Sequence, residues 1–243
     1  MEYTAIRRCL SPARLSRFDG EAGAFGQGPL GAIELYEWNA RLSAAMLVPL
    51  HLFEVVIRNA VDESISSRYG ASWPWNRAFI HSLPAADRGI DARGELLRQA
   101  SIQPSTGKVI AELRFAFWEQ MFTRRFVPAI WEQGFPLAFP LATPAQPVRQ
   151  RVIRMREDIE SIRRVRNRIA HYEPIFDRPI LQLVETIEAI AAWRSADLGD
   201  WVRCSHSVRE VVAARPPWFR RGAAAREQEK KPERSRAPSS PSR

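Results

Sequence analysis

The sequence is poor in lysine and cysteine and lacks a long apolar run. Only three of its 36 basic residues are lysine. Its two cysteines, Cys9 and Cys204, lie far apart, without the spacing of a zinc site or a redox pair. No segment has the roughly 18 uninterrupted apolar residues of a membrane span. Residues 1–8 lack the apolar core of a signal peptide. We therefore expect a reduced, soluble protein of the cytoplasm that makes no contact with a membrane.

The sequence also lacks the patterns that bind metals and nucleotides. No cluster of carboxylates and histidines has metal-ligand spacing, so we expect no metal. Gly107 and Lys108 resemble half of a phosphate-binding loop, but Ile102 and Val109 stand where that loop needs a glycine and a hydroxyl. We therefore expect no cofactor.

Basic residues exceed acidic residues by a wide margin. The formal net charge is +9 and the isoelectric point is near 10.4. Because nearly all the basic residues are arginine, they carry planar guanidinium groups that grip phosphate and stack on bases. This composition is compatible with RNA binding, and it is equally typical of a GC-rich genome.

Apolar residues recur at helical spacing along most of the chain, and no alternating strand pattern persists, apart from a short stretch at 108–110 that could be extended. The fold class predicted is all-α. Residues 1–30 read as an extended N-terminal arm with at most one short helix, residues 31–215 as one helical domain, and residues 222–243 as a disordered basic tail. The apolar content of 45% is enough to fill a core.

Several helices can be placed from this periodicity. Pro49 is expected to kink or restart the first long helix. A helix over 148–172 has the core stripe Val152, Met155, Ile159, Ile162, Val165 and Ile169. The next helix is expected to be capped by Asp177-Arg178-Pro179 and to bury Ile180, Leu183, Val184, Ile187, Ile190 and Ala191. A last helix is expected over 195–213. Further core residues are Leu113, Phe117, Trp118, Met121, Trp131 and Phe135.

The most informative stretch is the arginine-rich segment 163–175. Arg166 and Asn167 are adjacent, and His171 follows Arg166 after four residues. At about 100° per residue, Asn167 and His171 share a face of a helix, whereas Arg166 and His171 are about 140° apart. Pro174 disfavours helical geometry at the residue before it, which places His171 near a helix end. A guanidinium, an amide and an imidazole suit chemistry on a phosphate; alternatively, the arginines are a solvated face and His171 is a helix-end cap.

The segment from Arg166 to His171, followed by Glu173-Pro174-Ile175-Phe176, resembles the signature of Abi-like (abortive infection) proteins of the HEPN superfamily. The patterns at 36–39, 52–60, 69–73 and 107–118 are similar to that family as well, so the resemblance covers about residues 32–213. It implies a HEPN-like helical bundle enlarged by extra helices. It also implies a metal-independent ribonuclease site at a homodimer interface.

The resemblance assigns roles to residues of this chain. His171 would be the general acid or base, Arg166 would neutralise the phosphate and Asn167 would orient the reacting groups. The flanking residues expected to bind RNA are Arg163, Arg164, Arg168 and Tyr172. Glu54 and Arg58 form an i,i+4 pair, and together with Asn59 they are expected to support the site rather than to form a second one.

The function expected from the resemblance is that of an endoribonuclease toxin in antiphage defence, controlled by an antitoxin or a phage-derived trigger. The alternative is a non-catalytic helical module that binds RNA or protein. Some HEPN toxins carry a tyrosine two residues after the histidine, which a partner nucleotidyltransferase modifies. Glu173 occupies that position here. We therefore do not expect that mode of control.

Overall fold

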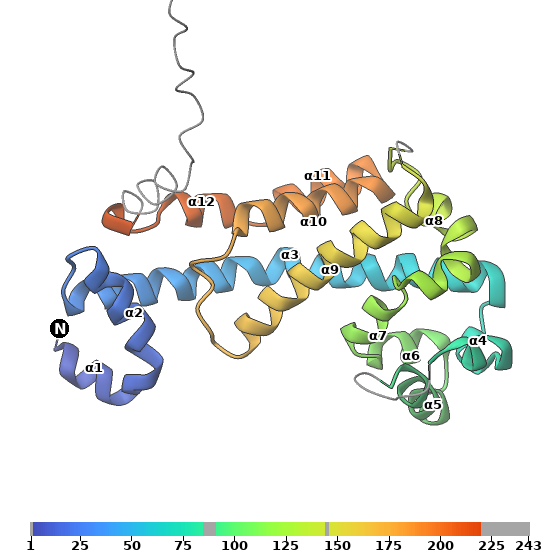
Figure 1. The fold of residues 1–243 in the computed structure, drawn as a ribbon, viewed down its shortest axis with the longest axis horizontal. Coiled ribbons are helices and arrows are strands. Elements are labelled where there is room, and N and C mark those ends of the chain that lie inside the picture. The colour runs from blue at the N-terminus through green and yellow to red at the C-terminus, as the bar shows by residue number, and fades with distance from the viewer. Residues whose placement is uncertain (1, 85–90, 144–145, 220–243) are drawn as a thin grey trace, which may run out of the picture. The chain divides into compact units, whose positions relative to one another are not determined.

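The computed structural model describes residues 2–84, 91–143 and 146–219. Within these ranges the chain is helical and contains no strand (Figure 1). The predicted all-α fold class is therefore confirmed. The predicted tail, residues 222–243, lies outside the described residues. The chain divides into two compact units, which are described separately below.

The described residues of the first unit are 2–42 and 209–219. The unit begins with two helices, α1 (Tyr3–Leu10) and α2 (Pro12–Ala24). The hydroxyl of Ser11 accepts a hydrogen bond from the Arg14 N–H, and Pro12 occupies the first helical position, so both start signals of α2 are present. The prediction of an extended arm is therefore wrong.

The C-terminal segment of the first unit packs on the start of α3 (Pro29–Tyr69). The Trp38 indole N–H donates to the Val211 carbonyl at 2.8 Å, and the Trp218 indole N–H donates to Glu34 at 2.8 Å. Phe219 lies against the rings of Trp38 and Trp218. These aromatic contacts join the two sequence ends of the unit.

Helix α3 runs for 41 residues and contains Pro49 in its interior. Of the two predicted effects of Pro49, a kink or a restart, the restart is wrong, although the proline removes one N–H donor from the helix. An 18-residue window of α3 has a mean hydropathy of 1.6, and 39% of this window is buried. By length and composition alone the helix is able to cross a membrane, but the core helices of soluble proteins meet the same criterion.

The second unit comprises Ser43–Val208 and packs short helices against the later part of α3. The prediction of an extended segment at 108–110 is wrong, because these residues lie in α6. The core residues predicted between Leu113 and Phe135 are all buried, which confirms that part of the core. The short helices are η1 (Trp73–Trp75), α4 (Arg77–Ser82), α5 (Ala92–Ile102), α6 (Thr106–Glu112), α7 (Phe115–Gln120), η2 (Arg124–Phe126), η3 (Val127–Trp131) and α8 (Glu132–Ala138).

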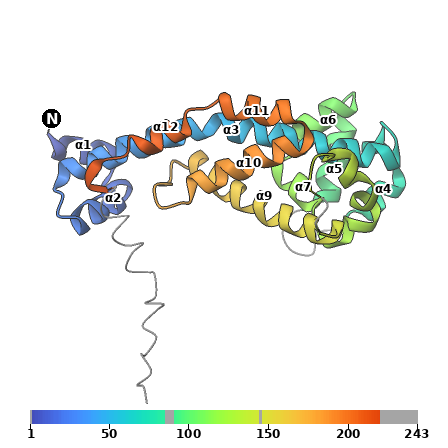
Figure 2. The same cartoon turned by 90° about the horizontal axis from the view of Figure 1, so that it is seen from above.

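The second unit continues with α9 (Val148–Ala170), α10 (Ile180–Arg194) and α11 (Ala196–Cys204), whereas α12 (Val208–Ala213) belongs to the first unit from Arg209 onward. Every predicted stripe residue of α9 and α10 is buried, which confirms both stripes. Helices α10 and α11 lie side by side (Figures 1 and 2). The N-cap residue of α10 is Pro179, the last residue of the predicted cap, and it makes no side-chain cap hydrogen bond.

The predicted last helix is interrupted between α11 and α12. The His206 side chain is buried there, with Nε2 at 3.1 Å from a Glu188 carboxylate oxygen. Its other ring nitrogen, Nδ1, accepts from the Val208 N–H at 3.4 Å. The histidine therefore satisfies a backbone donor at the start of α12, which compensates for ending α11 early.

Gly134 allows α8 to approach α3 closely. A Cβ atom at this position would lie 2.7 Å from the Cβ atom of Ser64 and 2.8 Å from its hydroxyl oxygen. The Ser64 hydroxyl donates to the Ala60 carbonyl, so it is fixed in place. Glycine at this position therefore permits the close contact between α8 and α3.

Candidate functional site

The residues of the arginine-rich segment lie on two sides of α9. At about 100° per residue, Arg166 falls between the positions of the buried stripe residues around α9, on the side that faces α3. The same arithmetic places His171 about 140° away, and its side chain is exposed. Arg166 and His171 of one chain therefore point in different directions.

Helix α9 ends in a Schellman motif that places His171 at the C-cap. The His171 N–H donates to the Asn167 carbonyl at 3.0 Å, the Tyr172 N–H to Ile169 at 3.0 Å, and the Glu173 N–H to Arg168 at 2.8 Å. Tyr172 has φ +55, in the left-handed region that usually holds glycine. The motif fixes the backbone around the histidine.

Arg168 stabilises the loop that follows this helix end. Its Nε donates to the Pro174 carbonyl at 2.9 Å, and its Nη1 lies 3.0 Å from a carboxylate oxygen of Glu173. Part of this guanidinium therefore stabilises the turn. Its second terminal nitrogen, Nη2, takes no part in these two contacts.

Tyr172 occupies a strained backbone position although its side chain is 80% exposed. Replacing Tyr172 by glycine is expected to raise the free energy of unfolding by about 1 kcal/mol, because glycine adopts this conformation without the clash of a Cβ atom. Thermal melting should show an increase of about 2–4 °C for a chain of this size. The same substitution should weaken RNA binding, since an exposed ring can stack on a base.

Tyr172→Phe is the matched control for this substitution. It keeps both the ring and the strained backbone, so stability and RNA binding should stay close to those of the wild type. A fall in melting temperature for Tyr172→Gly would show that contacts of the ring outweigh the backbone strain.

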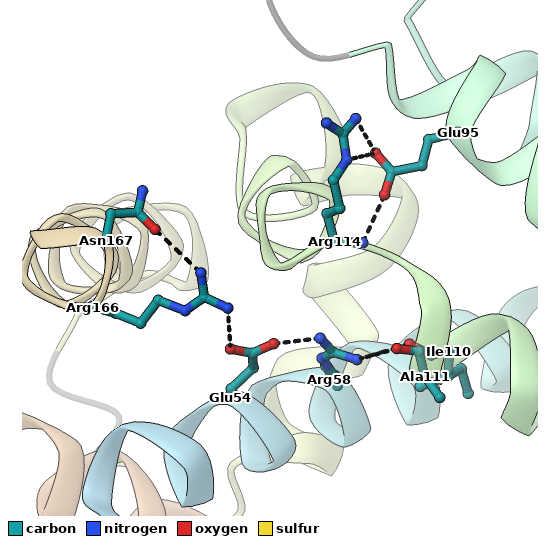
Figure 3. A network of polar contacts seen from close by, with 8 residues as sticks. All are labelled: Glu54, Arg58, Glu95, Ile110, Ala111, Arg114, Arg166 and Asn167. Atoms are coloured by element: carbon teal, nitrogen blue, oxygen red, sulfur yellow. Dashed lines mark hydrogen bonds and ion pairs between the residues drawn. The ribbon is translucent and has the colours of Figure 1, made fainter. Parts of the chain in front are cut away.

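Arg166 joins a network that begins on α3 (Figure 3). Its Nη2 lies 3.8 Å from one carboxylate oxygen of Glu54, and its Nη1 lies 3.4 Å from Oδ1 of Asn167. The other carboxylate oxygen of Glu54 accepts from Arg58, which confirms the predicted i,i+4 pair. One carboxylate thus faces two guanidinium groups, and the cluster keeps a net positive charge. Asn59 is exposed on the next position of α3.

Arg58 extends this network to the end of α6. Its Nη1 donates to the carbonyls of Ile110 and Ala111, at 3.1 and 2.9 Å, in the last turn of that helix. These are carbonyls that an α-helix leaves without an internal partner. Close by in Figure 3, Arg114 is held by the buried Glu95, whose hydrogen bond raises the pKa of the guanidinium.

Two further arginines that were predicted to bind RNA take part in ion pairs. Arg163 bonds through Nε to Glu119 on α7, and Arg164 pairs with Glu160 one turn earlier on α9. Arg163 is partly buried, so its contact serves packing between α9 and α7. Arg164 is 70% exposed, and a surface pair of this kind contributes only about 0–1 kcal/mol. Its guanidinium therefore remains accessible to a ligand.

An open pocket of about 440 Å³ lies between α9 and the start of α10. Arg164, Asn167 and Arg168 line it from α9, and Arg178 lines it from the segment before α10. The sequence interpretation missed Arg178, which was considered only as part of a helix cap. Its position shortly after the signature was the available signal.

The structure brings together Glu54, Arg58, Arg166 and Asn167, and it places His171 at the adjoining helix end. Such a set can hold an anion and can accept or deliver a proton. Across residues 2–84, 91–143 and 146–219, no three His, Cys, Asp or Glu side chains gather in a group able to hold a metal ion.

Comparison with known proteins gives no family assignment. The chain matches no protein-family model, and it shows no significant similarity to a curated protein or to a solved structure.

Proposed function

We propose that this protein is a metal-independent endoribonuclease that acts as an abortive-infection or toxin-type antiphage defence protein. The observation that carries the proposal is the Arg166-Asn167-x-x-x-His171 segment at an exposed, rigidly capped helix end. The resemblance of the segment to Abi-like proteins of the HEPN superfamily supports it. The excess of arginine supports an RNA substrate, since guanidinium groups bind phosphate.

The chemistry requires only proton transfer and charge stabilisation, because RNA supplies its own nucleophile. The 2′-oxygen loses its proton and attacks phosphorus, the bond to the 5′-oxygen breaks, and the 5′-oxygen gains a proton. The products are a 2′,3′-cyclic phosphate and a 5′-hydroxyl. His171 moves one of these protons as the general acid or base. Arg166 offsets the charge on the phosphorane, and Asn167 orients the phosphate or the imidazole.

A homodimer would complete the site, because Arg166 and His171 of one chain point in different directions. Two-fold symmetry places identical surfaces against each other, so each of two equivalent sites would take its histidine from one α9 end and its arginine from the other. An antitoxin or a phage-derived trigger is the expected regulator of such an activity.

A second function is favoured by one specific observation. Arg166 is paired with Glu54 in the free chain, as expected for an arginine that stabilises the fold and does not bind substrate. On that basis the protein would be a non-catalytic helical module that binds RNA or protein. The separation of 3.8 Å is long for an ion pair, however, and a phosphate could compete for this guanidinium.

Incubation of RNA with the protein in excess chelator tests the proposal. We expect the wild type to cut RNA in the chelator and to leave 2′,3′-cyclic phosphate ends, which are identified by mass spectrometry. Intact RNA that is bound equally by the wild type and by His171→Ala would instead identify a binding module.

A further inference from the structure

Arginine side chains from two segments of the chain line the pocket between α9 and α10. Arg164 and Arg168 reach it from α9, and Arg178 reaches it from the connection to α10. No acidic side chain is among the described residues that line it. Three guanidinium groups around one pocket repel each other unless an anion lies among them.

Each of these arginines is held from outside the pocket. Arg164 pairs with Glu160, Arg168 with Glu173, and Arg178 Nε lies 3.5 Å from Asp177. None of the three carboxylates lines the pocket. The pairs therefore hold the arginines while leaving N–H donors that these contacts do not use, since each guanidinium carries five.

The other walls of the pocket suit a nucleoside. Val165, Pro179 and Leu183 provide apolar surface, and Asn167 provides an amide. Pro179 is also the N-cap of α10, whose first turn contains no acidic residue, so the positive end of that helix lies at the pocket wall. A volume of about 440 Å³ lies within the usual range of small-ligand sites.

The pocket also lies on the side of α9 that carries His171. At about 100° per residue, Arg164, Asn167 and His171 fall within about 60° of each other, whereas Arg166 lies on the α3 side. We propose that this pocket binds a phosphate and its nucleoside in single-stranded RNA, adjacent to the phosphate on which His171 acts. The inference deepens the proposed function and rests on it for the choice of RNA.

Binding of a fluorescein-labelled 2′-O-methyl RNA 12-mer tests the pocket, because this strand has no free 2′-hydroxyl and cannot be cut. Arg178→Gln and Arg164→Gln are each expected to raise the Kd about tenfold near 0.1 M salt. Each should also reduce the slope of log K against log salt by about 0.7, the loss of one phosphate contact to a single strand.

Arg156→Gln is the matched control, since it removes the same charge from an exposed position of α9 outside the pocket. Its Kd should change less than twofold, and thermal melting should show all three variants folded. Equal effects of the pocket variants and the control would overturn the proposal. So would an unchanged salt slope.

Adenosine monophosphate distinguishes a free nucleotide from an RNA chain as the occupant. If Arg178→Gln abolishes binding of the mononucleotide but leaves binding of the 12-mer unchanged, the pocket serves a free nucleotide and the proposal fails. If the wild type does not cut ordinary RNA but binds the 12-mer in a way that depends on Arg178, the ribonuclease function is rejected. The assignment of the pocket as an RNA-binding site is then retained.

Discussion

Replacing His171 by alanine is expected to lower RNA cleavage about 100- to 10,000-fold, the usual contribution of a general acid or base. The melting temperature should stay within about 2 °C of the wild type, because the side chain is exposed and the helix end is held by backbone hydrogen bonds. Growth of cells that overexpress the variant should be normal, whereas expression of the wild type should arrest growth.

His51→Ala is the matched control, because His51 is another exposed histidine and lies on α3. It should leave cleavage and toxicity unchanged. A large loss of thermal stability in His171→Ala, with toxicity retained, would show that the histidine has a structural role only.

Mixing inactive His171→Ala protomers with inactive Arg166→Ala protomers is expected to restore activity. The two side chains lie about 140° apart around α9, so a site that uses both is completed across a two-fold interface. A mixed dimer then contains one site with both residues intact and one site with neither. Random exchange makes half of the dimers mixed, so cleavage should reach about a quarter of the wild-type rate.

The restoration is measured as cleavage rate against the ratio of the two variants, after the protomers have exchanged. Each variant mixed with itself should remain inactive. A protein that is monomeric at the assay concentration and still cuts RNA would show that one chain contains the complete site.

The sequence could predict those helices whose apolar stripe is regular. All six stripe positions of α9 are buried, and so are the six predicted in α10. The i,i+4 pair of Glu54 and Arg58 was also predictable, because both residues belong to one helix. Local patterns were sufficient in these cases.

Features that depend on contacts between distant segments were not predictable. The extended arm was wrong for another reason: the glycines of residues 1–30 suggested it, although Ser11 and Pro12 are local signals for the start of α2. The break after Cys204 depends on burial of His206 against Glu188. The approach of Arg166 to Glu54, and the position of Arg178 in the pocket, require the packing of helices that the sequence alone does not place.

Glu54 connects the α9 end to α6 through a chain of contacts. Arg58, its other partner, also holds the last carbonyls of α6. If a bound molecule shifts α6, Arg58 changes its position, and the electrostatic pull of Glu54 on Arg166 changes with it. An inhibitor or activator of this protein therefore does not need to touch the arginine-rich segment. Resistance mutations selected against the proposed toxin should then arise at α6 as well as at α9.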